Sequence, residues 1–156
     1  MSMRYDLVIN CDLREDVSED AIEAIRYLID PNYELKKTPY LPYKDPRYPD
    51  IGDMWKYFEP YRFLVPDPQH DIISNFRRIH RTTIPMENNR EVYRYRLQYC
   101  GSMLHDDYFA QSHMPFIYWL ANVVYGDFIG YYTETQIGSR KVHLLHVKDG
   151  RLEPSR

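Results

Sequence analysis

Alternating apolar and polar positions open the chain. In the run MRYDLVINCDL, apolar side chains fall on every second residue from Tyr5 to Cys11, with polar ones such as Asp6 between them. A period of two predicts a strand with one buried face. In SEDAIEAIRYLID the apolar residues recur instead at three- and four-residue intervals. That spacing predicts an amphipathic helix, capped by Ser18 and ended by Pro31.

Residues 31–68 break both patterns, because they hold eight of the eleven prolines and six of the 16 tyrosines. Proline removes a backbone donor, so this segment is predicted to be a long loop, packed on the body by its tyrosines. Inside it, Asp53 is placed to cap a short helix that runs to Phe58. The run YRFLV, residues 61–65, suits a short strand. Long loops of this kind often carry function.

Two further alternating runs, residues 76–84 and 91–100, flank the segment MENNRE. Adjacent asparagines tolerate the positive φ that a tight turn needs, which predicts a hairpin with a two-residue loop at Asn88–Asn89. The register of such a loop sets Arg81 opposite Arg96. It therefore gathers Arg77 and Arg81 with Arg94 and Arg96 on one face and leaves the tyrosines of EVYRYRLQYC on the other.

The C-terminal third predicts one more helix and one more hairpin. The helix lies in LHDDYFAQSHMPFIYWLANVVYGDF, with Asp106 or Ser112 as its cap and Gly126 at its end. FIGYYTETQ and RKVHLLHV form the hairpin around Gly138. The element order predicts an α+β fold in a single domain spanning residues 1–156. Its antiparallel sheet carries two helices on one face, in a ferredoxin-like βαββαβ layout with an extra C-terminal strand.

The stretches YDLVINCDL near the start and GDFIGYYTE near the end resemble a group of small uncharacterised bacterial α+β proteins. The resemblance covers most of the chain in pattern. It implies the fold just described and no chemistry, because that group has no settled function.

In this layout the helices cover the apolar face of the first strand, from Tyr5 to Cys11, together with the tyrosines of residues 91–100. The open face then carries Asp6, Val8 and Asn10. It also carries the four arginines that are the candidate ligand-binding residues, Arg77, Arg81, Arg94 and Arg96. Charges of one sign cannot be buried unpaired, since an orphaned buried charge costs about 3–5 kcal/mol.

Three interpretations of this arginine face remain open. Water can solvate it, with Asp6 and Glu134 neutralising part of its charge. The planar guanidinium groups can bind a small anionic ligand through a carboxylate or a phosphate. The open face can also pack against a second copy of the chain, because symmetric dimers are the commonest oligomers.

Composition narrows the function without identifying it. The net charge of −3 carries no general footprint for nucleic acid, and Tyr and Arg alternate onto opposite faces, so one strand of nucleic acid could not use both. With no apolar run of membrane-spanning length and only two cysteines, we expect a cytoplasmic protein. Six glycines form no phosphate-binding loop, so no nucleotide cofactor is expected.

Candidate catalytic and metal-binding residues have ordinary structural explanations. His143 and His146 are three apart on a predicted strand, so they face opposite ways and predict no metal site. The cluster HDDY, residues 105–108, suits a helix cap, and acid–base chemistry there is an alternative. Cys11 and Cys100 point to opposite faces, which disfavours a disulfide between them.

These observations favour a non-catalytic binding or protein-interaction domain that forms a homodimer. The alternative is a small enzyme, similar to oxygenases or isomerases, with a pocket over the arginine face; this alternative rests on fold analogy alone.

Overall fold

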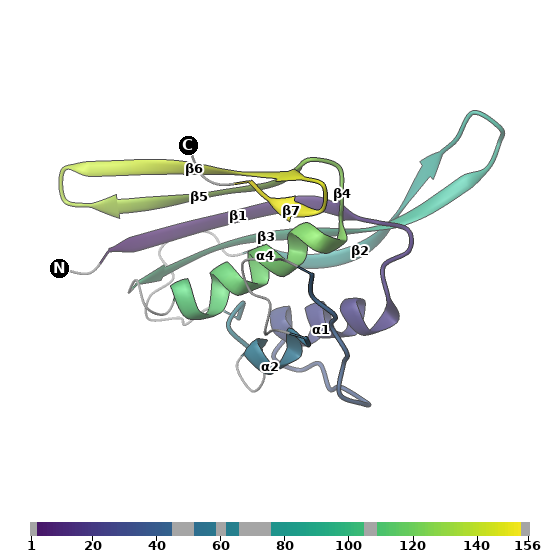
Figure 1. Ribbon diagram of the computed structural model, residues 1–156, viewed down its shortest axis with the longest axis horizontal. Helices are drawn as coiled ribbons and strands as arrows, with labels where there is room; N and C mark the ends of the chain where they lie inside the picture. The colour runs from purple at the N-terminus through teal and green to yellow at the C-terminus, as the bar shows by residue number, and fades with distance from the viewer. Residues whose placement is uncertain (1–2, 45–51, 59–61, 66–75, 105–108, 154–156) are drawn as a thin grey trace.

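A computed structural model describes residues 3–44, 52–58, 62–65, 76–104 and 109–153 (Figure 1). Its elements, in chain order, are β1 (Arg4–Leu13), α1 (Glu19–Ile29), α2 (Trp55–Phe58), β2 (Phe76–Pro85), β3 (Glu91–Leu104), the π-helical turn η1 (Phe109–His113), α4 (Met114–Val123), β4 (Val124–Tyr125), β5 (Phe128–Gln136), β6 (Ser139–Lys148) and β7 (Arg151–Leu152).

The strands form one seven-stranded sheet in the order β2-β3-β1-β5-β6-β7, and β4 pairs with β1 off this path. Every described pairing is antiparallel. The prediction of a mixed α+β fold with an antiparallel sheet is therefore confirmed. At the centre, β1 is paired on both sides, with β3 and with β5.

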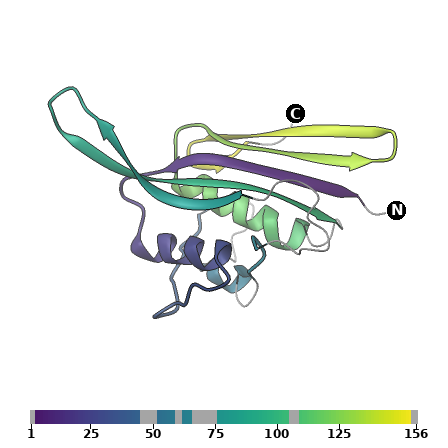
Figure 2. The same ribbon diagram turned by 180° about the vertical axis from the view of Figure 1, so that it is seen from behind.

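The helices lie on one side of this sheet, as both views show (Figures 1 and 2). Burial alternates along β1, where each odd-numbered residue from Tyr5 to Leu13 is buried and the residues between them are less covered. Leu97 and Tyr99 of β3 lie on the same covered face, because they pair with Cys11 and Ile9. The expected assignment of the apolar face of β1 to the helix side is confirmed.

The local sequence signals of α1 act as predicted. The Ser18 hydroxyl accepts a hydrogen bond from the backbone N–H of Ala21 over 3.1 Å, which satisfies one of the donors that a helix start leaves open. Ile22, Ile25 and Leu28 are buried against the sheet. Pro31, two residues after the last helical residue, cannot continue the helix.

Helix α4 is buried more widely than α1. Phe116, Ile117, Trp119 and Leu120 point in different directions around it, yet none is more than 1% exposed. Phe58 and Phe116 stack edge to face with ring centroids 5.7 Å apart. The helix is therefore held between the sheet and the proline- and tyrosine-rich segment.

That segment supplies part of the core, through residues Leu41, Tyr43, Met54, Trp55, Phe58, Phe63 and Leu64. Asp53 organises its described part, because its Oδ1 accepts hydrogen bonds from the backbone N–H groups of Leu41 (2.9 Å) and Trp55 (3.1 Å). The expected short helix is confirmed. The strand expected at 61–65 is wrong for residues 62–65, where the Val65 N–H donates to the Arg62 carbonyl in a turn.

The C-terminal strands follow the predicted hairpin, in which β5 and β6 are joined at Gly138, whose φ is 78°. Asp149 and Gly150 both have positive φ, the conformation of a two-residue type I′ turn, and so add the short strand β7. Among the described helices, none is long and apolar enough to cross a membrane.

A bulge in β5 brings two backbones into close contact. The register between β5 and β6 shifts between Phe128 and Gly130, and a Cβ added to Gly130 would lie 2.0 Å from the backbone oxygen of Val8. Only glycine allows this approach.

We therefore expect Gly130→Ala to lower the free energy of unfolding by about 1–3 kcal/mol, because the backbone of the central strand must move. Urea denaturation measures this change. Gly52→Ala is the control, since no described atom lies within 4 Å of a Cβ at that position, and its effect should stay within about 0.5 kcal/mol. Equal stability of the parent and Gly130→Ala would contradict the assignment.

Candidate functional site

The β2–β3 hairpin differs from the prediction by one residue. The Met86 N–H donates to the Arg90 carbonyl and Pro85 pairs with Glu91, so the loop has three residues rather than two. Asn89 takes the left-handed conformation with a φ of 58°, which is typical of a three-residue hairpin loop. A shift of one residue moves every side chain of β2 to the opposite face.

This register separates the four candidate arginines. Arg81 pairs with Tyr95 and Arg77 with Tyr99, so both belong to the face that the helices cover. Arg94 and Arg96 stay on the open face, where their partners on β2 are Thr82 and His80. The prediction that Arg77, Arg81, Arg94 and Arg96 share one face is wrong.

Arg94 and Arg96 each contact an acidic side chain. Arg96 donates from Nε to Asp12 Oδ1 over 2.7 Å and from a terminal nitrogen to Oδ2 over 3.4 Å, and this hydrogen bond raises the pKa of Arg96. Arg94 donates to Glu15 over 3.2 Å and lies 3.6 Å from the centroid of the Tyr125 ring. Both guanidinium groups are therefore neutralised within the chain.

Arg77 and Arg81 have different partners. Arg77 Nε donates to the carbonyl of Ile29 over 2.8 Å, which satisfies an acceptor at the C-terminal end of α1. The exposed Arg81 lies 4.4 Å from the centroid of the Tyr93 ring. The four arginines therefore do not converge on one ligand, and anion binding by them stays a prediction.

The acids expected to neutralise the arginine face have other partners. Asp6 accepts from Arg4 (3.0 Å) and from the Ser102 hydroxyl (2.6 Å). Glu134 lies on the covered face, 3.0 Å from Nε2 of His143. Asp12 and Glu15 therefore neutralise Arg96 and Arg94, the role predicted for Asp6 and Glu134.

The histidines follow their predicted faces. His143 stacks on Tyr132 on the covered side, with ring centroids 4.5 Å apart, and His146 lies against Phe128 on the open side. His80 lies between Arg78 and Arg96; its partial desolvation, and then these two charges, lower its pKa. Within the described residues no three His, Cys, Asp or Glu side chains gather closely enough to hold a metal ion. The HDDY cluster, 105–108, lies outside the described residues.

The open face carries a feature that the sequence pattern did not predict. Strand pairing aligns one residue from each of five neighbouring strands in a line across the sheet, and we call this line the apolar row. Its members, from β2 to β6, are Phe76, Cys100, Val8, Tyr131 and Leu144. Phe76, Tyr131 and Leu144 are 49%, 37% and 54% exposed. Large apolar side chains that meet on an uncovered face often mark an interaction surface.

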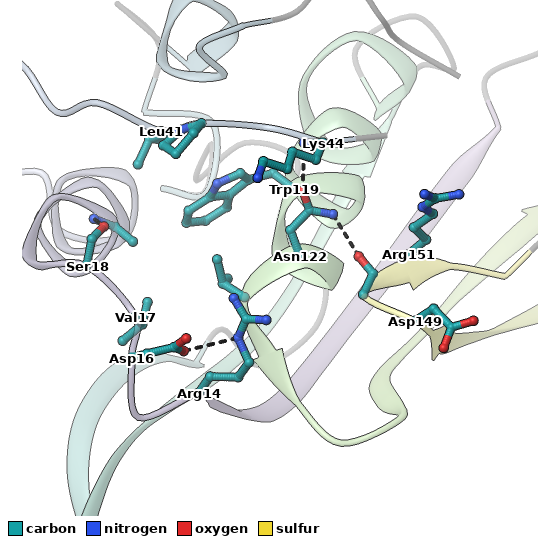
Figure 3. A pocket seen from close by; sticks show the side chains of 14 residues that line it. Arg14, Asp16, Val17, Ser18, Leu41, Lys44, Trp119, Asn122, Asp149 and Arg151 are labelled. Carbon is teal, nitrogen blue, oxygen red and sulfur yellow. Dashed lines mark hydrogen bonds and ion pairs between the residues drawn. The ribbon is translucent and has the colours of Figure 1, made fainter. Parts of the chain in front are cut away.

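Two cavities lie at opposite ends of α1, on the helix side of the sheet. The cavity at the start of α1 has a volume of about 520 Å³ and is lined by Ser18, Lys44, Trp119 and Asn122 among others (Figure 3). The second lies beside Ile29 at the end of α1 and includes Arg77. Neither cavity is lined by Arg94 or Arg96.

The sequence could not show directly either the apolar row or the cavity at the start of α1. The apolar row depends on the register of four strand pairs, and the wrong hairpin loop displaced Phe76 from it. Lys44 and Asn122 are far apart in the chain, yet the backbone N–H of Lys44 donates to Asn122 Oδ1 over 3.0 Å. No spacing rule connects two such positions.

We expect Arg94→Ala to lower the free energy of unfolding by about 1–2 kcal/mol, because it removes an ion pair and a cation–π contact from a side chain that is only 11% exposed. Arg81→Ala, at an exposed position, should change it by less than about 0.5 kcal/mol. Urea denaturation at one protein concentration compares the two. If both variants lose the same free energy of unfolding, the buried, ion-paired environment of Arg94 and the exposed environment of Arg81 are contradicted.

Burial, and then the neighbouring Asp12, raise the pKa of Cys11 to about 12, so its thiol stays protonated at pH 8. We expect iodoacetamide to modify at most one thiol per native chain at pH 8 and both thiols after unfolding. In Cys100→Ser, intact-mass measurement should find no adduct on the native protein. Fast native labelling of this variant would show that Cys11 is accessible.

Comparison with known proteins assigns no family to this chain. No protein-family model matches it, and neither a curated protein nor a solved structure matches it. The features that bear on its function are the paired arginines, the apolar row and the cavity at the start of α1.

Proposed function

We propose that the chain is a non-catalytic protein-interaction domain that forms a homodimer through the open face of its sheet. The apolar row is the observation that carries this proposal. It crosses five strands without a charged residue and leaves Phe76, Tyr131 and Leu144 partly exposed to water. Covering these side chains contributes roughly 25 cal/mol for each Å² of apolar surface removed from water.

A second copy fits this surface because the row is apolar from end to end. When two copies of one chain pack sheet face to sheet face in a symmetric dimer, the two-fold axis lies in the plane between the sheets. An axis along the row sets each row residue against its own copy, so apolar side chains meet apolar side chains across the whole row. The contact is self-complementary, as an isologous interface requires.

The charges on β1 favour this axis over one that runs along the strand. Arg4 and Asp12 lie at equal distances on either side of Val8, so an axis along the row sets Arg4 against Asp12 of the partner subunit. This contact extends the Arg4–Asp6 and Arg96–Asp12 ion pairs into a network. An axis along β1 would instead set Asp6 against Asp6 and Asp12 against Asp12, and like charges disfavour such an interface.

We also infer a ferredoxin-like layout. The strand order β2-β3-β1-β5 supports it. Along the chain, α1 lies between β1 and β2, which are separated in the sheet by β3, and α4 lies between β3 and β5, which are separated in the sheet by β1. In this layout β6 and β7 are the C-terminal additions, and β6 extends the open face by Leu144.

Leu144→Glu tests the dimer, because it would bury a carboxylate without a partner in the interface. Such a charge costs about 3–5 kcal/mol, so the dimer dissociation constant should rise by at least about a hundredfold. Sedimentation velocity over a concentration series measures it. Ile137→Glu is the matched control: it is 81% exposed at the tip of the β5–β6 hairpin, outside the row, and should leave the dimer unchanged.

A parent chain that stays monomeric at millimolar concentration would rule the homodimer out. Arg4→Glu then tests the direction of the axis. With the axis along the row, it sets a glutamate against Asp12 of the partner subunit and weakens the dimer. With the axis along β1, one like-charge contact replaces another and the dimer keeps its affinity.

A further inference from the structure

The cavity at the start of α1 lies on the side of the sheet opposite to the apolar row, between the start of α1, helix α4 and the β6–β7 turn (Figure 3). We propose that it binds a small organic anion. Lys44 holds its carboxylate or phosphate group, Arg14 adds positive charge to the cavity, and the anion's apolar part lies against the wall formed by Val17, Leu41 and Trp119. This site is independent of the dimer interface.

Two cationic side chains of the cavity can serve a ligand. Lys44 is exposed and has no ion pair among the described residues. Arg14 lies 3.2 Å from Asp16, with the two side chains 49% and 76% exposed. A surface pair of this kind contributes little, so an incoming anion can replace Asp16 as the partner of Arg14. Lys44 lies beside Trp119, and Arg14 lies next to Asp16 at the other end of the cavity lining (Figure 3).

The walls of the cavity are held in place before any ligand arrives. Asn122 of α4 accepts from the Lys44 N–H over 3.0 Å and donates from Nδ2 to the Gly150 carbonyl over 2.8 Å. One side chain therefore fixes both the segment that carries Lys44 and the β6–β7 turn (Figure 3). Asp53 fixes the neighbouring Leu41 N–H over 2.9 Å. A site with fixed walls loses less entropy when it binds.

Size and lining also suit a small molecule. The volume of about 520 Å³ lies within the usual range of small-molecule pockets, about 300–1,000 Å³. Such pockets combine an apolar wall with a few polar groups that fix orientation. Here Val17, Leu41 and Trp119 form the wall, and the cations lie beside it. Asp149 and Arg151 lie farther out, beyond Asn122 (Figure 3).

The cavity at the other end of α1 shows why the first is the better anion site. There the Arg77 guanidinium donates to the Ile29 carbonyl, and Arg26 lies 3.9 Å from Glu23. Its cations already serve the chain, and the C-terminal end of a helix carries partial negative charge. At the first cavity the start of α1 adds a favourable field to the two cations, which carry the binding.

Titration of the ¹⁵N-labelled full chain with phenyl phosphate, benzoate, inorganic phosphate and phenol tests the proposal by NMR. We expect phenyl phosphate or benzoate to shift the Lys44 and Gly150 amides and the Asn122 side-chain amide, and to leave Arg96 unshifted. The organic anion should bind more tightly than inorganic phosphate, and phenol should not bind. Comparison of phenyl phosphate with benzoate distinguishes a phosphate from a carboxylate ligand.

Lys44→Met should weaken binding of the better anion by about tenfold or more, because a hydrogen bond to a charged group is lost. Lys141→Met, an exposed lysine of β6 far from the cavity, is the control and should bind as the parent does. The proposal is overturned if no probe shifts these amides at millimolar concentration. It is also overturned if inorganic phosphate binds as tightly as the organic anions, or if the two lysine variants lose equal affinity.

Discussion

The pairing of β1 on both sides is the constraint on which the rest of the structure depends. Because β1 is hydrogen-bonded to β3 and to β5, its side chains have two possible directions, toward the helices or away from them. Leu7 and Ile9 point toward the helices and are almost fully buried. Val8, between them, must then point outward, and it becomes the centre of the apolar row.

Features that depend on neighbouring residues could be predicted from the sequence. The alternation from Tyr5 to Cys11 gives the strand and its buried face, and Ser18 with the spacing of Ile22 and Ile25 gives the helix. Asp53 likewise identifies a short helix within a segment rich in proline. In each case the residues that cause the structure lie within a few positions of it.

The candidate site could be predicted less well, because one conformational choice decides it. Asn88 and Asn89 allow a loop of two or three residues, and the sequence around them suits both. The left-handed conformation of Asn89 selects three and so exchanges the faces of Arg81 and His80. The cavity depends on contacts between distant segments, such as Lys44 and Asn122, that no local pattern reports.

The arginines on β2 have a consequence beyond their contacts, because β2 is the edge strand of the sheet that the described residues form. An unpaired edge can add strands from other chains without limit, and charged side chains and proline oppose such growth. Arg77, Arg78 and Arg81 lie along this edge, and Pro85 ends it. A symmetric contact between two copies closes as a pair, whereas a head-to-tail contact between the edges of many copies extends into filaments. Charged side chains and a terminal proline on β2 therefore disfavour this kind of fibrous assembly.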